Sequence, residues 1–407
     1  MQIGWIDFSK TERDKVVSVL DLLSEQGVLD ELGIAQIRDG IANLFFPGTT
    51  TIQTRAKYFL MIPYIFKSLE SNSTKDYSKL KKELNDLERN CAVTLLEKNP
   101  DESGVIGKRS ISQNKWVQRP PSNIYWAGLK TYKIFHSDVS IDQYLNTICF
   151  RKSLKSNISK SGNSNDNPDE GHDDKGAGDI QSFNFWKIPK YEEGWFDKLE
   201  MDLTKEEGEF LKEQIISSCP DSMLAFILKN NRKDILEFKS FSELEQIENI
   251  FPEAMKKSFR LAKDFSDFNL VLRILFNVIA SDGENEDANK YFDALKPNLR
   301  EIADFDLKEI FSLLRIRDVP LKSFLLNAQE LMKDEKIGEL KDLIKSREIF
   351  LKGENRSKTC NPGEFGDKWL GGFDLDYRFF IAKTIAEDIF KSEEYIDVVN
   401  SDSEGEL

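Results

Sequence analysis

Apolar residues recur every three or four positions along most of the chain, which is the spacing of an amphipathic helix. In the N-terminal part this pattern predicts helices over residues 9–27, 34–46, 52–59 and 80–95. The first of these begins with a Ser-x-x-Glu capping box, and the Pro47-Gly48 pair ends the second. The start of the chain therefore reads as a succession of short helices.

The second half of the chain has the same helical period. Thr204 and Glu207 form another capping box. Strand candidates are short and few, and they lie around Ile106, at Trp116–Val117 and at Ile134–Phe135. The pattern as a whole predicts a mainly α, multi-helical protein. The later apolar runs at helical spacing are 224–228, 259–280, 310–314, 324–332, 337–350 and 379–390.

A polar stretch divides this pattern into two parts. Residues 152–180 are rich in Ser, Asn, Asp, Gly and Lys, so burial of side chains cannot offset the entropy lost on ordering them. We expect a flexible linker or long loop here. It would separate an N-terminal helical domain, residues 1–151, from a C-terminal helical domain, residues 181–399, with an acidic tail at 400–407.

The residue types argue against most catalytic and metal sites. Only two histidines occur, His136 and His172, and no P-loop motif is present. The acidic segment 282–287 lacks the spacing of an EF-hand loop. Sequence reasoning therefore identifies no catalytic residue, no metal site and no cofactor. The cysteines are too scattered for a zinc ribbon or a disulfide framework: Cys91, Cys149, Cys219 and Cys360.

The expected location is the cytoplasm. The N-terminus lacks the basic and apolar regions of a signal peptide. The apolar run at 58–66 is shorter than the roughly 20 residues that cross a bilayer. No membrane association is expected.

One window contrasts with the net charge of −14. Residues 105–135 contain basic and aromatic side chains but no Asp or Glu. Basic groups without acidic competitors are typical of surfaces that contact phosphates. The candidate DNA-binding residues of this basic window are Lys108, Arg109, Lys115, Arg119, Tyr125, Trp126, Lys130 and Lys133.

The basic window resembles a winged-helix unit. Pro120-Pro121-Ser122 begins a helix, and residues 122–132 would be the helix presented to a DNA groove, with basic flanks on phosphates. The alternative is that the lysines are simply solvated and that the apolar residues form a core face, made of Ile124, Tyr125, Leu129 and Tyr132. Both interpretations are open from the sequence.

Two further basic stretches allow a similar choice. Around residues 49–58 a helix–turn–helix arrangement would direct Gln53, Arg55 and Lys57 towards DNA, whereas an ordinary helical hairpin needs no ligand. Near the C-terminus, ion pairs that stabilise the fold are the favoured interpretation. The basic residues there are Arg347, Lys352, Arg356 and Lys358.

Six groups of motifs carry a family resemblance: Gly4–Ser9, Ala42–Thr49, Thr54–Phe59, Pro121–Trp126, Arg347–Glu348 with Leu351–Gly353, and Leu375–Arg378. Together they resemble an uncharacterised bacterial family that is classed only as a domain of unknown function. The resemblance spans nearly the whole chain and implies no established activity. It implies an association with helicase-containing and nuclease-containing anti-phage defence gene clusters.

These features favour a non-catalytic DNA-binding or scaffolding subunit of a multi-protein anti-phage defence system. Such a subunit would recruit or regulate an ATPase, helicase or nuclease partner. Two alternatives remain: a metal-dependent nuclease built from the many carboxylates, and a protein–protein adaptor without nucleic-acid contact. A pocket of converging carboxylates would favour the nuclease, and a continuous positive surface would favour binding.

Overall fold

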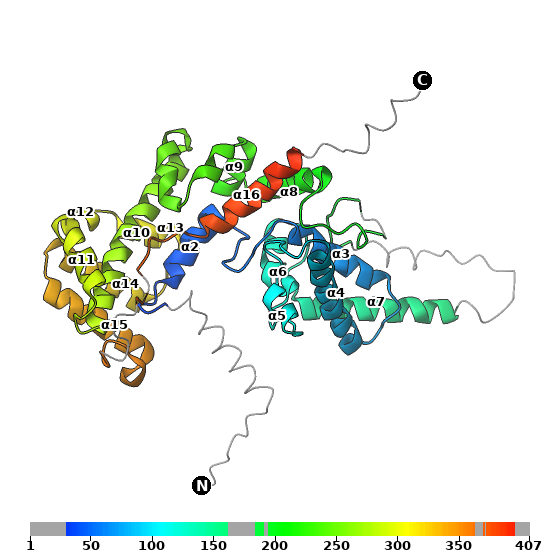
Figure 1. Cartoon of the computed structure of the whole chain (residues 1–407), viewed down its shortest axis with the longest axis horizontal. Coiled ribbons are helices and arrows are strands. Elements are labelled where there is room, and N and C mark those ends of the chain that lie inside the picture. The colour runs from blue at the N-terminus through cyan, green and yellow to red at the C-terminus, as the bar shows by residue number, and fades with distance from the viewer. Residues whose placement is uncertain (1–29, 162–183, 191–193, 363–368, 371, 395–407) are drawn as a thin grey trace, which may run out of the picture. The chain divides into compact units, whose positions relative to one another are not determined.

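The computed structural model describes residues 30–161, 184–190, 194–362, 369–370 and 372–394 (Figure 1). The chain divides into two compact units. Unit 1 combines residues 1–41 with 252–375, and unit 2 combines 42–251 with 376–407. Each unit is therefore built from segments that are far apart in sequence.

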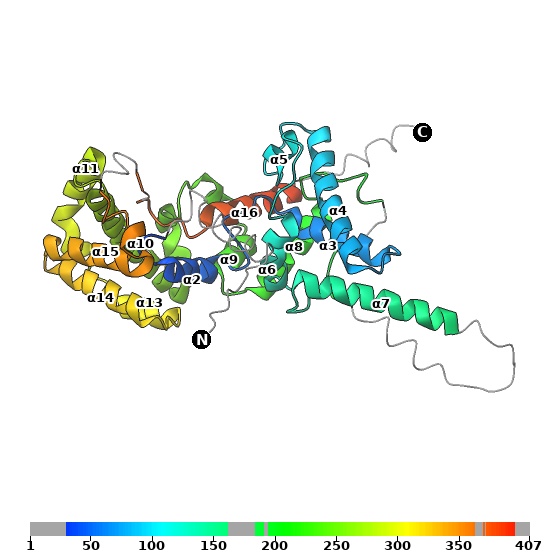
Figure 2. The same ribbon diagram turned by 90° about the horizontal axis from the view of Figure 1, so that it is seen from below.

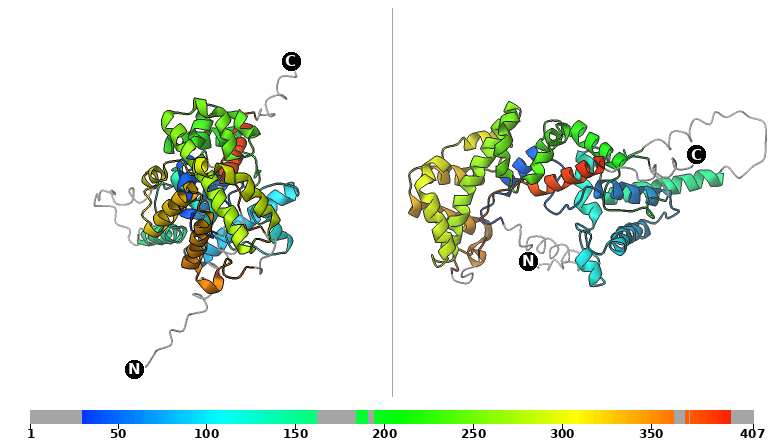
Figure 3. Two further views of the ribbon diagram at one scale, coloured as in Figure 1. Left: turned by 90° about the vertical axis from the view of Figure 1, so that its left-hand side faces the viewer. Right: turned by 45° about the horizontal axis from the view of Figure 1, so that its top comes forward.

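The described residues form helices and connecting loops, and the views in Figures 2 and 3 show no sheet among them. The mainly α prediction is confirmed. Ile106 lies in a turn, and Trp116–Val117 has no regular structure. Phe135 forms an isolated antiparallel bridge with Trp186. The winged-helix element is not confirmed, because none of the three strand candidates forms a strand that could serve as a wing.

Unit 2 is organised around a helix that is buried on all sides. In α3 (Tyr58–Ser71), every residue from Tyr58 to Phe66 is buried. Helices α4 and α6 both pack against it. The other helices of unit 2 are α4 (Tyr77–Lys98), α5 (Lys108–Ser112), α6 (Pro121–Thr131), α7 (Ile141–Ser161), α8 (Lys205–Ser218), α9 (Met223–Lys229) and α16 (Phe379–Glu393), with 3-10 helices at Lys233–Glu237 and Phe241–Ile250.

An aromatic cluster fills one part of the unit 2 core. The ring centroids of Trp126 and Phe135 are 4.5 Å apart, and those of Phe135 and Trp186 are 4.7 Å apart. Phe66 stacks on Trp186 at 5.4 Å. Trp186 follows the polar stretch in sequence and Phe135 precedes it, so residues on both sides of that stretch share one core.

The polar stretch itself differs in part from a linker. Residues 152–161 continue α7, where Lys152 donates to the backbone oxygen of Leu69 at 2.5 Å. Residues 162–180, the rest of the expected linker, lie outside the described residues, as do the predicted helix at 9–27 and the acidic tail. The division into domains at this stretch stays a prediction.

Unit 1 is built on a long central helix, α10 (Glu253–Ala280), which packs against α11 and α15. Its buried side chains include Phe259, Phe265, Phe268 and Leu272. Helix α2 (Ala35–Phe45) contains the boundary between the two units. The remaining unit 1 helices are α11 (Glu286–Leu295), α12 (Leu299–Ile302), α13 (Leu307–Leu313), α14 (Val319–Lys333) and α15 (Ile337–Lys352), with short 3-10 turns at Lys296–Asn298 and Glu354–Arg356.

Local sequence signals account for several helix ends. The capping box of α8 is confirmed: Glu207 N–H donates to Thr204 Oγ1 at 3.3 Å, and Thr204 N–H donates to Glu207 Oε2 at 2.9 Å. The helix predicted from residue 52 begins later, at Tyr58. The preceding turn is held by Gln53, whose side chain accepts from Thr50 N–H at 3.2 Å.

The described helices include none with the length and apolar character that a membrane crossing needs.

A close approach between α6 and the turn before α3 gives a test of the unit 2 packing. A Cβ added at Gly128 would lie 2.4 Å from the carbonyl oxygen of Gly48 and 2.8 Å from the ring of Phe59. We expect Gly128→Ala to destabilise the protein by about 1–3 kcal/mol despite the better helix propensity of Ala, because backbone cannot move aside cheaply. Chemical denaturation would measure this.

The matched control is Gly194→Ala in the same unit, where an added Cβ meets nothing within 4 Å. Its free energy of unfolding should change by less than about 0.5 kcal/mol. Equal effects of the two substitutions would contradict the close packing of α6 on the Gly48 turn.

Candidate functional site

Arg55 connects several segments of unit 2 through one guanidinium group. Its Nε donates to both carboxylate oxygens of Asp388, at 2.9 and 3.0 Å. Its Nη1 donates to Glu102 at 2.9 Å and its Nη2 to Asp202 at 2.7 Å. Asp388 also accepts the backbone N–H of Ala56 at 2.7 Å. Burial raises the pKa of Asp388, although the charge of Arg55 acts in the opposite direction.

The polar side chains two residues before and after Arg55 also form hydrogen bonds or ion pairs within unit 2. Lys57 is buried and pairs with Glu207 at 2.7 Å. Gln53 is buried and donates to the backbone oxygen of Gly48 at 3.1 Å. The three residues predicted to face DNA from this stretch therefore have partners within unit 2. Their placement favours the helical-hairpin alternative.

The two aromatic candidates of the basic window are buried in α6. The Tyr125 hydroxyl accepts from the N–H groups of Thr54 and Arg55, at 2.8 and 3.1 Å, and donates to the carbonyl of Arg55 at 2.9 Å. Trp126 Nε1 donates to the backbone oxygen of Val139 at 3.0 Å. Helix α6 is thus a core helix that supports the Arg55 segment, as in the alternative of a core face.

The basic candidates of the window have a different environment. Arg109, Lys115, Arg119 and Lys133 are exposed. Lys108 donates to the backbone oxygen of Glu102 at 3.0 Å, and Lys130 to that of Asp138 at 3.4 Å. Across the part of the chain that the structure describes, none of these six side chains forms an ion pair. Their charges are available to an external ligand.

One more cation lies beside this window. Arg89 of α4 donates to the side chain of Asn114 at 3.3 Å. This hydrogen bond places Arg89 next to the loop that carries Lys115 and Arg119. The sequence window did not include Arg89, because it belongs to another helix about 25 residues earlier in the chain.

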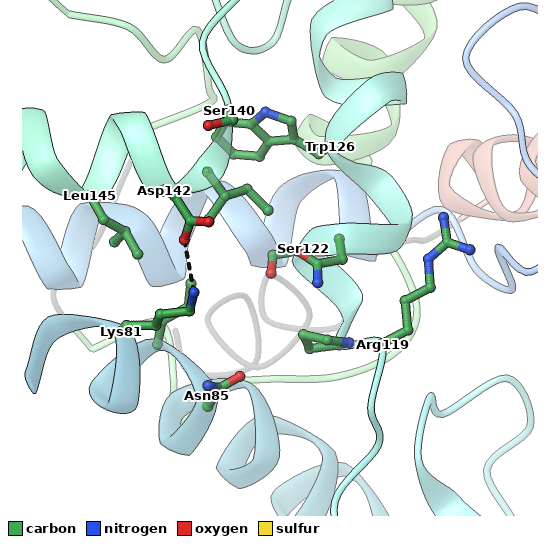
Figure 4. Close-up of a pocket in the computed structure, with 12 residues that line it drawn as sticks. Lys81, Asn85, Arg119, Ser122, Trp126, Ser140, Asp142 and Leu145 are labelled. Carbon is green, nitrogen blue, oxygen red and sulfur yellow. Dashed lines mark hydrogen bonds and ion pairs between the residues drawn. The ribbon is translucent and has the colours of Figure 1, made fainter. Parts of the chain in front are cut away.

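A groove of about 390 Å³ opens between α4, the start of α6 and the start of α7 (Figure 4). Figure 4 shows Lys81 and Arg119 on opposite sides of it, with Asn85 below and Trp126 above. The volume lies within the range of small-ligand sites. Its apolar lining is Leu84, Pro120, Trp126, Ile141 and Leu145, and its polar lining is Lys81, Asn85, Arg119, Ser122, Asn123, Ser140 and Asp142.

The charged pair in the groove is fixed by hydrogen bonds. Lys81 and the Tyr77 hydroxyl both donate to Asp142, at 2.9 and 2.7 Å. Hydrogen bonds from Tyr77 and Lys81 lower the pKa of Asp142 and keep it ionised at neutral pH. By contrast, the side chains of Asn85, Arg119 and Asn123 have no hydrogen-bond partner among the described residues. Sequence reasoning identified Arg119 and Trp126 but missed the other residues of this groove.

A buried carboxyl group lies beneath the start of α6. Glu88 Oε1 accepts the N–H of Ser122 at 2.6 Å, while Oε2 has no partner among the described residues. Burial raises the pKa of Glu88 to about 7, although hydrogen bonds from Ser122 act in the opposite direction. Glu88 therefore supports α6 and titrates near neutral pH.

The C-terminal basic stretch belongs to a buried charge cluster in unit 1. Glu31 and Glu348 are fully buried. Lys352 pairs with both carboxylates, and Lys358 pairs with Glu31 at 2.8 Å. Burial lowers the pKa of Lys352 to about 8. These pairs favour a role in stabilising the fold.

The two arginines of that stretch make further contacts with the backbone. Arg347 Nε donates to the carbonyl of Leu32 at 3.0 Å and its guanidinium lies over the ring of Phe324. Arg356 donates to the carbonyl of Lys352 at 3.1 Å. The residues before α2 are thereby attached to α15.

No group of three or more candidate metal ligands occurs within the described ranges. In the acidic segment at 282–287, Asn285 caps α11 by accepting the N–H of Ala288 at 2.9 Å. The segment comprises the end of the loop between α10 and α11 and the first two residues of α11.

Comparison with known proteins gives a family without an assigned activity. A model described as "Family of unknown function (DUF6361)" matches residues 1–311. No curated protein and no solved structure matches the chain. The chemistry of its own residues is therefore the basis for a functional argument.

The Arg55 hydrogen bonds predict a large loss of stability when the guanidinium is removed. Arg55→Ala leaves the buried Asp388 carboxylate without its cation, which we expect to cost about 3–5 kcal/mol in the free energy of unfolding. Denaturant titration would measure it. Arg119→Ala, which removes an exposed arginine, is the control and should cost less than about 0.5 kcal/mol. Similar stabilities of the two variants would show that Arg55 is not a stabilising centre.

The raised pKa of Glu88 predicts a pH-dependent effect on stability. The folded state favours the protonated form of Glu88. Its contribution to the free energy of unfolding is therefore fully present below the unfolded pKa of 4.5 and is lost as the pH rises towards 7. The loss amounts to about 3 kcal/mol for a shift of this size. Glu88→Gln removes this dependence and keeps an acceptor for Ser122.

Unfolding at pH 5 and pH 8 would test this expectation. The stability of Glu88→Gln relative to the wild type should rise by about 2.5 kcal/mol between the two values, because part of the loss has already occurred at pH 5. Glu97→Gln, an exposed substitution on the same helix, controls for the removal of one carboxylate. If the free energies of unfolding of Glu88→Gln and the wild type differ by the same amount at both pH values, the folded-state pKa of Glu88 is not near 7.

Proposed function

We propose, for a chain that belongs to the family of unknown function DUF6361, that unit 2 binds nucleic acid through the basic window and the adjoining groove. The protein would act as a non-catalytic DNA-binding or scaffolding subunit. The observation that carries the proposal is the set of basic side chains in residues 105–135 that have no acidic partner among the described residues.

The acidic character of the chain makes this set informative. At a net charge of −14, a basic side chain has many carboxylates with which to pair, as Arg55 and Lys57 do. Exposed ion pairs contribute little to stability. The stability of the fold therefore gives no reason for a surface region without acidic residues. Binding to phosphates does favour such a region, because each neutralised phosphate releases a counterion.

The mode of binding follows from the burial of α6. Tyr125 and Trp126 face the core, so α6 has no exposed aromatic face to read base edges in a duplex groove. The available cations lie on α5, on the loop that follows it and at the two ends of α6. We propose that these cations contact the phosphate backbone, which gives affinity and position but little sequence preference.

A second function, binding of a protein partner, is favoured by exposed aromatic side chains in unit 1. Tyr291 and Phe373 are 58% and 74% exposed, and both lie beside Trp369, with ring centroids 5.7 and 6.2 Å away. Clustered exposed aromatic rings are typical of protein interfaces. The family resemblance implies that such a partner is an ATPase, helicase or nuclease of an anti-phage defence system.

The nucleic-acid proposal predicts which side chains carry the affinity. Replacing Lys115, Arg119, Lys130 and Lys133 by Ala should weaken DNA binding roughly tenfold or more at low salt. The salt dependence should also fall, by about 0.9 in logarithmic slope for each duplex phosphate that the variant no longer neutralises. Titrations at two salt concentrations with single-stranded and duplex DNA would measure both quantities.

A second fourfold variant controls for the change in net charge. Lys75, Lys205, Lys229 and Lys239 are exposed lysines of unit 2 outside the basic window. Their replacement by Ala removes the same charge and should leave most of the affinity. Thermal melts would establish that both variants are folded. The proposal is wrong if the wild type does not bind DNA, or if the two fourfold variants bind equally well.

A further inference from the structure

We propose that the groove between α4, α6 and α7 holds one unstacked nucleobase of a single-stranded nucleic acid. This inference rests on the proposed function and makes it more specific. It identifies the part of the ligand that enters the groove, and it assigns the phosphates to the exposed cations outside.

The lining of the groove has the composition that a planar, uncharged heterocycle requires. Ile141, Pro120 and the edge of Leu84 offer apolar surface to the face of a ring, and the polar side chains stand around them (Figure 4). The rim of the indole of Trp126 adds to this surface, although the side chain itself is almost fully buried. Ligand sites commonly combine an apolar lining with a few polar groups that fix orientation.

Two amide side chains in the groove have unused hydrogen-bonding capacity. Asn85 on α4 and Asn123 on α6 line the groove, and neither side chain has a partner among the described residues. Each amide offers hydrogen-bond donors and an acceptor, which can pair with the acceptors and donors along the edge of a base. An Asn side chain can bind an adenine edge through two hydrogen bonds.

The electrostatics of the groove favour a neutral base over a phosphate. Lys81 is paired with the ionised carboxylate of Asp142, so among the side chains that line the groove only Arg119 is left as an unpaired cation for a phosphate. The N–H of Ser122 at the start of α6 is already used by Glu88, so this helix end does not offer that donor to a phosphate. Asp142 is also an acceptor for an exocyclic amino group, as carboxylates are for cytosine.

Arg119 connects the groove with the cations outside it. Its side chain lines the groove, and Lys115 lies four residues earlier on the same exposed loop. A base in the groove therefore places its own backbone next to basic side chains. Bases in a duplex are stacked and paired, so this arrangement requires a single strand or an extruded nucleotide.

A pair of oligonucleotides separates this inference from the proposed function. One is a short single-stranded DNA of mixed sequence, and the other is an abasic strand with the same number of phosphates. We expect the full-length wild type to bind the base-bearing strand roughly tenfold more tightly, because interactions with a base add to those with the phosphates. Fluorescence anisotropy at fixed salt would measure both affinities.

Substitutions in the groove test where the base lies. The double variant Asn85→Ala with Asn123→Ala should bind both strands with nearly the affinity that the wild type has for the abasic strand. Asn90→Ala, an exposed substitution on the same helix, should keep the full preference for bases. Both sets of substitutions are at side chains without hydrogen bonds among the described residues, so the variants should fold, and thermal melts would verify this.

The outcomes distinguish the two proposals. Equal binding of both strands by the wild type would overturn the base site and leave phosphate binding intact. A double variant that keeps the full preference would also overturn it, as would tighter binding of duplex than of single strands. No binding of either strand would overturn the proposed function together with this inference.

Discussion

The fold of unit 2 depends on the buried ion pair between Arg55 and Asp388. Taking two charged groups out of water is costly, so the pair is tolerated only because its hydrogen bonds are almost completely satisfied. Arg55 donates hydrogen bonds to three carboxylates, and Asp388 accepts them from the guanidinium and from a backbone N–H. Removal of one partner leaves the other charge buried without compensation. The surrounding helices are thereby held to one arrangement.

This constraint also decides which basic residues are available to a ligand. Arg55 and Lys57 form short buried ion pairs with carboxylates, whereas Lys115, Arg119 and Lys133 are exposed. The difference follows from the support that α6 gives to residues 54–55 through the Tyr125 hydroxyl. The same helix is therefore fixed to the core on one side, and its basic ends and flanks remain at the surface.

The sequence predicted the helical class and several individual elements correctly, because helical period and capping signals are local. Thr204 and Glu207 needed only their own spacing to identify the start of α8. The outward placement of Arg55 could not be judged in this way, since its partner Asp388 is 333 residues away in the chain. The groove was missed for the same reason: Asn85, Asn123 and Asp142 lie on three helices and have no common motif.

The interleaving of the two units has a consequence for synthesis on the ribosome. Residues 252–375, which supply most of unit 1, are made as one continuous segment, whereas unit 2 needs α16 from beyond that segment. Chains emerge from the N-terminus and domains generally fold as units during synthesis. Arg55 therefore leaves the ribosome long before Asp388 is translated. Until then the growing chain has an incomplete unit 2, in which the guanidinium of Arg55 lacks Asp388 and the apolar side chains that pack against α16 lack their cover.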